Sequence, residues 1–256
     1  MELKFYKYQG TGNDFVMVDN RDGAFDTNNT VLVEKLCHRR FGIGADGFIL
    51  LENEPGYDFK MVYFNSDGNQ SSMCGNGGRC IVQFAHDIGV IGDKTKFLAI
   101  DGPHDAYLEK KLVHLKMIDV NQIENNEDHF YMNTGSPHYV KKVEGIKNFP
   151  VFEEGKKIRY NERFKEKGTN VNFTEKEGKT LHVRTYERGV EDETFSCGTG
   201  VTAAALAASY SGMTSPVRIQ TLGGELSISF QKTADGFNNV FLIGPAQRVF
   251  EGTVTI

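Results

Sequence analysis

The sequence predicts an α/β (α+β) protein of two similar domains, each built from about half of the 256 residues. Two local motifs each occur twice at one offset. Cys74 opens "CGNGGRCIVQFAHDIG" and Cys197 opens "CGTGVTAAALAASYSG", and 197 − 74 is 123. "TGNDFVMV" begins at Thr11 and "TGSPHYVKKV" at Thr134, and 134 − 11 is again 123. Because unrelated matches rarely share an offset by chance, we infer an internal duplication.

The order of predicted elements also agrees between the halves. The alternating stretches "FKMVYFNSDG" (59–68) and "LHVRTYERG" (181–189) predict strands that end in a polar turn before each cysteine motif. Further strands are predicted after each motif, at 97–100, 105–109 and 112–117 in the first half and at 217–221, 225–230 and 239–243 in the second. Each half therefore has strands before and after one helix, within the usual size of a domain.

Each Cys-Gly-x-Gly motif predicts the start of a helix, which Gly89 ends in the first half and Gly212 in the second. A third helix is predicted in "TVLVEKLCHRRFG", capped by Thr30 and stopped at Gly42. The simplest interpretation of Cys37 in that helix is a small buried hydrophobic residue.

The composition limits the function classes. Apolar residues make up 39% and charged residues 25% of the chain, which favours a compact protein. The net charge of −5 argues against a nucleic acid partner, since such a partner needs a basic face. The start of the chain has no apolar signal-like core, and its most apolar helical stretch is far shorter than the roughly 20 residues of a membrane span. We therefore expect a cytosolic protein without membrane contact.

The four cysteines are expected to be thiols, because a cytosolic protein rarely carries structural disulfides. None lies in a C-x-x-C pair, and the spacing of Cys74 and Cys80 fits no common zinc motif, so no metal site is expected. Cys80 lies six residues after Cys74, or 240° around a helix, so we expect it to be a packing residue.

A thiol at a helix start suits acid–base chemistry. The first helical turn carries unbonded N–H groups and partial positive charge, which favour a bound carboxylate and a thiolate. If Cys74 and Cys197 share one site, one thiolate can take a proton from a carbon while the other thiol returns one on the opposite face. The backbone N–H groups of Gly75, Asn76, Gly198 and Thr199 would hold a carboxylate on that carbon. No P-loop, pyridoxal-phosphate lysine or Rossmann fingerprint is recognised, so this racemisation or epimerisation is expected to need no cofactor.

The chain resembles the diaminopimelate epimerases in "GTGNDFV", "FNSDG", "MCGNGGRC", "YERG" and "CGTG", taken in this order and spacing. The resemblance extends from Gln9 to "GPAQRVFEG" at 244–252. It implies an isomerase, independent of pyridoxal phosphate, that interconverts LL- and meso-diaminopimelate, a precursor of lysine and of cell-wall peptide. It also implies a homodimer and two pseudo-symmetric domains, each a curled, largely antiparallel sheet around a central helix. The final strand crosses back, so the implied bounds are 1–117 with about 247–256 for the first domain and 118–246 for the second.

The resemblance also assigns roles to individual residues. Cys74 and Cys197 match the two acid/base thiols. Substrate-binding positions are matched by Asn13, Asn65, Gly75, Asn76, Asn170, Glu187, Arg188, Gly198 and Thr199. His138 and Glu187 match positions that adjust the proton affinity of the thiols. The chain departs from many relatives at Ser136 and Gly47, where an amide side chain is replaced, and neither is predicted to bind substrate.

Other interpretations remain open from the residues alone. Asn13 and Asn65 lie in strong turn signals, Asn76 is a good helix cap, and Arg188 could form a surface ion pair. Among functions, a proline or hydroxyproline racemase would also use a cysteine pair. A thiol redox protein and a duplicated small-molecule binder are the alternatives from other classes.

Overall fold

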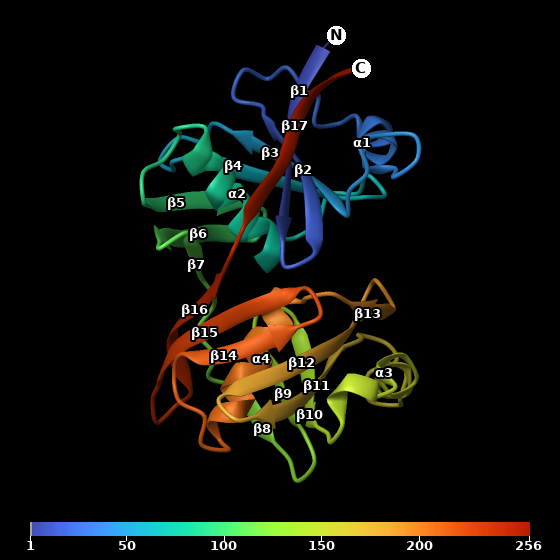
Figure 1. Ribbon diagram of the computed structural model, residues 1–256, viewed down its shortest axis with the longest axis vertical. Coiled ribbons are helices and arrows are strands. Elements are labelled where there is room, and N and C mark those ends of the chain that lie inside the picture. Colours follow the sequence, from blue (N-terminus) through green and yellow to red (C-terminus); the bar gives the residue numbers. More distant parts are fainter. Residues whose placement is uncertain (1) are drawn as a thin grey trace. The chain divides into compact units, whose positions relative to one another are not determined.

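The computed structural model describes residues 2–256, which divide into two compact units (Figure 1). Unit 1 runs from the start of the chain to Leu115 and includes Pro245–Ile256, and unit 2 is Lys116–Gly244. The mixed α+β class predicted from the sequence is confirmed, with strands far outnumbering helices among the described residues.

Unit 1 holds two helices, α1 (Thr30–Cys37) and α2 (Gly75–Asp87). Its strands are β1 (Glu2–Gly10), β2 (Asn13–Asp19), β3 (Gly47–Glu52), β4 (Lys60–Asn65), β5 (Lys94–Ala99), β6 (Gly102–Glu109), β7 (Leu112–Lys116) and the C-terminal β17 (Gln247–Thr255). Strand β17 pairs antiparallel with β1, so the two ends of the chain lie side by side (Figure 1).

Unit 2 holds η1 (Ile146–Asn148), α3 (Val151–Arg159) and α4 (Gly198–Ser209). Its strands are β8 (Ile123–Asn125), β9 (Phe130–Asn133), β10 (Pro137–Lys142), β11 (Asn170–Glu177), β12 (Thr180–Glu187), β13 (Asp192–Thr194), β14 (Val217–Thr221), β15 (Gly224–Lys232) and β16 (Phe237–Gly244).

The two units repeat one pattern of strand pairing. In unit 1, β1–β2, β3–β4, β5–β6 and β6–β7 are antiparallel, while β2–β3 and β4–β5 are parallel. In unit 2, β9–β10, β11–β12, β14–β15 and β15–β16 are antiparallel, while β10–β11 and β12–β14 are parallel. This shared order of parallel and antiparallel pairs supports the inferred duplication.

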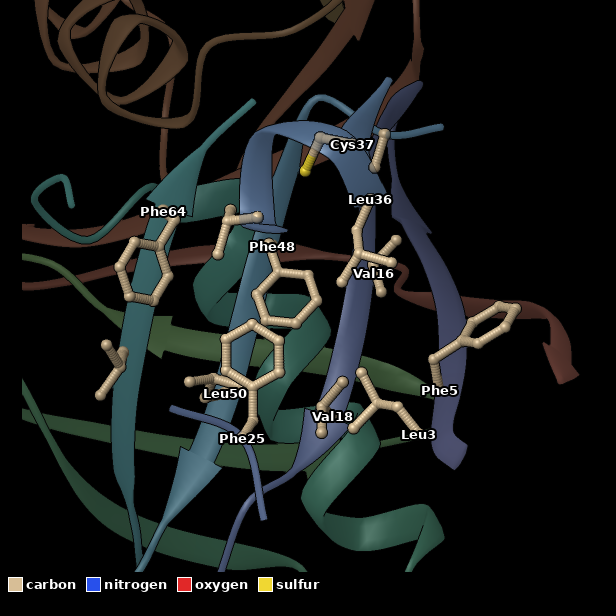
Figure 2. Packing of buried hydrophobic residues seen from close by; sticks show 13 residues of the cluster. Leu3, Phe5, Val16, Val18, Phe25, Leu36, Cys37, Phe48, Leu50 and Phe64 are labelled. Carbon is tan, nitrogen blue, oxygen red and sulfur yellow. The ribbon is translucent and has the colours of Figure 1, made fainter. Parts of the chain in front are cut away.

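Strand β3 of unit 1 is buried on both faces, and α2 packs against one of them. Strand β3 reads "GFILLE", and its first five residues are buried. One face carries Phe48 and Leu50 into an apolar cluster against α1, shown in Figure 2. The other face carries Ile49 toward α2, where its Cδ1 atom lies close to Gly77. An uninterrupted apolar run is expected for a strand covered on both sides.

Helix α4 of unit 2 is buried almost all round, as its sequence "GTGVTAAALAAS" permits. It packs against strands on several sides, namely β9, β10, β11, β12, β14, β15 and β16. Helix α2 packs in the same way against β1, β2, β3, β6 and β17. Small residues let the strands approach these helices closely, so the start of each helix is held rigidly.

One predicted helix needs correction. The side chain of Asn29, rather than that of Thr30, accepts the capping hydrogen bond from the Leu32 N–H, and the helix ends at Cys37 instead of continuing toward Gly42. His38 adopts an extended conformation because the chain turns back there over the last turn of the helix. Within residues 2–256, no helix has the length and apolar character needed to cross a bilayer.

Candidate active site

Cys74 lies at the N-cap of α2, with an extended backbone (φ −93°, ψ 132°). Its carbonyl accepts a hydrogen bond of 2.7 Å from the N–H of Gly78, which closes the first turn. Its Sγ lies 3.7 Å from Oδ1 of Asn13, at the β1–β2 turn. The thiol is therefore held at the positive end of a buried helix, where a thiolate or a bound anion is favoured.

Two asparagine side chains complete this part of unit 1. Nδ2 of Asn76 lies 3.4 Å from Oδ1 of Asn13, the same oxygen that contacts Cys74. Nδ2 of Asn13 donates to Oδ2 of Asp46 at 2.8 Å, which fixes the orientation of the amide. The strand register pairs Phe15 with Gly47 and Gly47 with Asn65, so Asn65 ends its strand at the same edge of the sheet. The predicted residues of unit 1 are thus gathered together.

A charged cluster supports this edge. Asp14 forms ion pairs with Lys7 and Arg39, each at 2.7 Å, and Arg39 also pairs with Asp46 at 2.7 Å. Burial raises the pKa of Asp14, but the hydrogen bonds and charges of Arg39 and Lys7 outweigh it and hold that pKa well below its ordinary value. Asp14 is therefore an anion, and together with Asp46 it anchors the turn carrying Asn13.

Cys197 occupies the matching position in unit 2, at the N-cap of α4 (φ −117°, ψ 112°). Its Sγ lies 3.5 Å from Oγ1 of Thr199, and Thr199 Oγ1 lies 3.1 Å from Oγ of Ser136. Ser136 Oγ in turn lies 3.0 Å from Nε2 of His138. A chain of hydrogen-bonding groups therefore leads from the thiol through two hydroxyls to a buried imidazole.

The hydrogen bonds of His138 define its protonation. The amide of Asn172 accepts from Thr185 through Oδ1 and donates from Nδ2 to the carbonyl of Tyr139, so Nδ2 also donates to Nδ1 of His138. Nδ1 is then an acceptor, and Nε2 carries the proton that is donated to Ser136. Burial, with a smaller effect from the charge of Arg188, lowers the pKa of His138 to about 3. The imidazole is neutral near pH 7.

The remaining predicted residues of unit 2 are Asn170, Glu187 and Arg188, and they lie where β11 begins and β12 ends. The register pairs His138 with Asn170, and Asn170 donates to Ser136 Oγ at 3.1 Å. Oδ1 of Asn170 accepts from the backbone N–H of Arg188 at 2.9 Å. The guanidinium of Arg188 donates to the carbonyl of Lys167, and Glu187 Oε2 accepts from the hydroxyl of Thr194 at 2.8 Å.

The structure adds two residues that the sequence interpretation missed. Ser136 contacts Thr199, His138 and Asn170, so it is the centre of the network, although it was set aside as a departure from the relatives. Asn172 anchors the imidazole. The 123-residue offset could have identified Ser136, because 136 − 13 is 123 and Asn13 is its counterpart. Nothing in the sequence marked Asn172 apart from its neighbours in "TNVNF".

Gly47 has no room for a side chain. A Cβ atom there would lie 2.6 Å from Cε2 of Tyr63 and 2.9 Å from the carbonyl of Phe64. The ring of Tyr63 therefore fills the space into which an amide side chain would extend.

The other two cysteines are packing residues, as predicted. Cys37 and Cys80 are buried, and burial raises the pKa of each thiol to about 12. Figure 2 shows the sulfur of Cys37 among apolar side chains. Such thiols are poor nucleophiles and bases near pH 7. In the described part of the chain, all four cysteines are thiols rather than halves of disulfides, and no group of three metal-ligating side chains is placed to hold an ion.

The neutral state of His138 predicts a pH dependence of stability. Its folded pKa lies below the ordinary value of 6.5, so the unfolded chain binds more protons between about pH 6.5 and 3. The contribution of neutral His138 to the free energy of unfolding is fully present above pH 6.5. As the pH falls below 6.5, this contribution decreases by up to about 1.4 kcal/mol per pH unit. Urea unfolding of the wild type and of His138→Gln from pH 7 to 4 measures this effect. The free energy of unfolding should depend less steeply on pH in the variant. Parallel curves would contradict this assignment.

The chain is similar to known proteins over nearly its whole length. The family model for diaminopimelate epimerase matches residues 5–102 and 130–249. A diaminopimelate epimerase of Flavobacterium psychrophilum is 52% identical, covering 98% of this chain and all of that protein. One from Aquifex aeolicus is 39% identical, covering 99% and 98%.

Solved structures with low sequence identity share the fold. A phenazine biosynthesis protein of the PhzF family from Bacillus anthracis has a TM-score of 0.79 at 14% identity, covering 100% of both chains. A hydroxyproline epimerase from Agrobacterium vitis, solved with trans-4-hydroxy-L-proline, has a TM-score of 0.68 at 13% identity, covering 99% of this chain and 92% of that one.

Proposed function

Because this chain belongs to the diaminopimelate epimerase family, we propose that it epimerises diaminopimelate with Cys74 and Cys197 as its acid/base pair. The observation that carries the proposal is the repeated arrangement of a thiol and small polar side chains at the start of a buried helix. It occurs once in each unit: Asn13 contacts Cys74 and is bonded to Asn76, and Thr199 contacts Cys197 and is bonded to Ser136.

The proposed reaction is an exchange of protons at one carbon. The thiolate of one cysteine takes the α-proton, so the C–H bond breaks and an S–H bond forms. The thiol of the other cysteine gives its proton to the opposite face, so its S–H bond breaks and a new C–H bond inverts the centre. After one turnover the two cysteines have exchanged protonation states, and the reverse reaction then starts from the product.

The carbanion that forms between these steps places negative charge on the adjacent carboxylate. Backbone N–H groups at Gly75, Asn76, Gly198 and Thr199 are the proposed donors, since the first turn of a helix leaves such groups unbonded. The second end of the substrate carries another amino group and another carboxylate. We assign it to Asn65, Asn170, Glu187 and Arg188, whose amide, carboxylate and guanidinium groups match those charges.

His138 and Glu187 are proposed to adjust the proton affinity of Cys197. The imidazole is neutral and reaches the thiol only through hydroxyls, so it acts by orienting Ser136 and Thr199 and not by accepting the substrate proton. A neutral network of this kind holds Thr199 in one orientation while Cys197 changes charge.

Isotope exchange tests the proposed substrate. Purified protein in ²H₂O should incorporate deuterium at the α-carbon of LL-diaminopimelate and form the meso isomer, without any added cofactor. Proline and trans-4-hydroxyproline, tested side by side, should show no exchange above background. Exchange of proline at a comparable rate would instead favour the racemase alternative. Disulfide exchange with glutathione without amino-acid turnover would favour a redox role.

The cellular setting is proposed on chemical grounds. Two thiols that must shuttle protons work only in the reduced state, which favours the cytoplasm. A homodimer is proposed for the assembly, and analytical ultracentrifugation of the purified protein tests it. The exposed apolar side chains of Val249 and Phe250 on β17 are consistent with a contact surface on unit 1.

A further inference from the structure

Arg79 is a buried cation in the second turn of α2. Its side chain is 0% exposed. Among residues 2–256 its guanidinium donates to neutral groups: the carbonyl of Gly75 at 3.2 Å, Oγ1 of Thr11 at 3.1 Å and the carbonyl of Pro245 at 3.4 Å. No carboxylate within residues 2–256 forms an ion pair with it. Burying a charge without a counter-ion is costly, so the fold retains this arginine against its own stability.

The guanidinium contacts the residue that follows Cys74 and the turn that carries Asn13. The Arg79 side chain runs back along the helix to Gly75, the residue that follows the thiol. It also holds Thr11, two residues before Asn13, whose Oδ1 contacts the Cys74 sulfur. Burial lowers the pKa of Arg79, and negative charge on Cys74 or Cys80 would oppose that effect.

Arg79 is closely packed against its neighbours. A Cβ atom on Gly10 would lie 3.3 Å from Nη2 of Arg79 and 3.2 Å from the sulfur of Cys80. Cys80 itself is fully buried, and burial raises the pKa of its thiol to about 12. Cys80 is therefore neutral and does not compensate the charge of Arg79.

The other charged groups around α2 have ion-pair or hydrogen-bond partners. Asp14 and Asp46 are matched by Lys7 and Arg39, which pair with them directly. Between β5 and β6, Asp101 receives hydrogen bonds from His104 and from the backbone of Met73. At the other end of the helix, Asp87 accepts from Tyr8 on β1, and on β17 Arg248 pairs with Glu251. Arg79 is thus the buried charge of this region that lacks an opposite charge when Cys74 is a thiol.

Unit 2 has no such cation at the equivalent position. The counterpart of Arg79 is Thr202, because 79 + 123 is 202, and Thr202 donates to the carbonyl of Gly198 at 2.9 Å. Gly198 is the counterpart of Gly75, because 75 + 123 is 198. The carbonyl at this equivalent position is therefore bound by a guanidinium in unit 1 and by a neutral hydroxyl in unit 2.

We propose that Arg79 is a positioning residue that stabilises the thiolate of Cys74, so that in the substrate-free enzyme Cys74 is the thiolate and Cys197 is the thiol. This inference rests on the proposed function for its meaning. The fixed charge is desolvated, is bound to the carbonyl of the residue that follows Cys74, and forms no ion pair with a carboxylate of residues 2–256. It therefore acts on Cys74 much more strongly than a surface charge would. The first proton of a catalytic cycle is then taken by Cys74.

Thiol alkylation measures this directly and without turnover. The full-length protein is pulsed with iodoacetamide from pH 5 to 10, and modification of Cys74 and Cys197 is quantified on separate peptides. In the wild type the midpoint for Cys74 should lie at least one pH unit below that for Cys197. In Arg79→Met the Cys74 midpoint should rise by a unit or more, with alkylation at pH 7 slowed about tenfold.

Two further variants separate charge from structure. Arg79→Lys keeps the charge and should move the Cys74 midpoint much less than Arg79→Met does. Thr202→Val removes the matching hydrogen bond in unit 2 without changing charge, and should leave both midpoints in place. An unchanged Cys74 midpoint in a folded Arg79→Met protein would overturn the proposal. The proposal would also be overturned if, in the wild type, the alkylation midpoint of Cys197 lay at or below that of Cys74. This second comparison needs no variant. Either outcome leaves the proposed epimerase activity intact, since that is tested by isotope exchange.

Discussion

Replacing either Cys74 or Cys197 by alanine should lower kcat for epimerisation by about 10³-fold or more. General acid–base groups typically contribute 10²- to 10⁴-fold, and here both groups are required in every turnover. The two variants should differ from the wild type in a second way. The thiol that remains can still remove and return a proton on its own face, so deuterium incorporation without inversion should fall less than interconversion does. Chiral chromatography with mass spectrometry of the same samples measures both.

Cys37→Ala is the matched control for this pair. Cys37 lies in the apolar cluster of Figure 2 and its thiol is neutral near pH 7, so its removal should change kcat by less than about twofold. Any loss of stability from the small cavity would appear in the melting temperature and not in the chemistry. Wild-type rates of interconversion in Cys197→Ala would exclude the two-base mechanism.

The sequence was sufficient for the features that repeat. Both helices that follow a Cys-Gly-x-Gly motif begin at the residue after the cysteine, and β14 spans the predicted 217–221. These predictions succeeded because glycine patterns and alternation are local signals, and because each half served as a check on the other. The cap of α1 was misplaced by one residue because Asn29 and Thr30 are both good caps and only the backbone geometry distinguishes them.

The supporting residues of the site could not be predicted in the same way. Asn172 is buried and bonded to His138, yet in the sequence it is a polar residue in a strand, which normally faces water. Arg79 follows a glycine-rich helix start, where an arginine is usually solvated. Their roles depend on contacts with residues far away in the sequence, such as Thr11 and Tyr139, that no local pattern encodes.

A single methyl group at Gly200 should be among the most damaging small changes in the protein. A Cβ atom there would lie 2.4 Å from Oδ1 of Asn172 and 3.3 Å from the sulfur of Cys197. Asn172 cannot move aside without losing its buried hydrogen bonds to His138 and Thr185. Overpacking and unsatisfied polar groups each cost about 1–3 kcal/mol, and alanine regains about 1 kcal/mol of helix propensity. We expect Gly200→Ala to lower the free energy of unfolding by roughly 2–4 kcal/mol.

Gly77→Ala is the control, because Gly77 is the third residue after Cys74 as Gly200 is after Cys197. Its added methyl would lie closest to the flexible ends of Ile49 and Met61, at 3.1 and 3.4 Å, which can shift by a few tenths of an ångström, and would make an ordinary contact of 3.6 Å with the ring of Phe15. The gain in helix propensity then offsets the crowding, so its stability should stay within about 1 kcal/mol of the wild type. Epimerase activity should fall at least tenfold in Gly200→Ala and not in Gly77→Ala, because the methyl group at position 200 displaces the network that orients Thr199 beside Cys197. Equal losses of stability and activity in the two variants would show that general helix crowding, and not the Asn172 contact, sets the requirement for glycine.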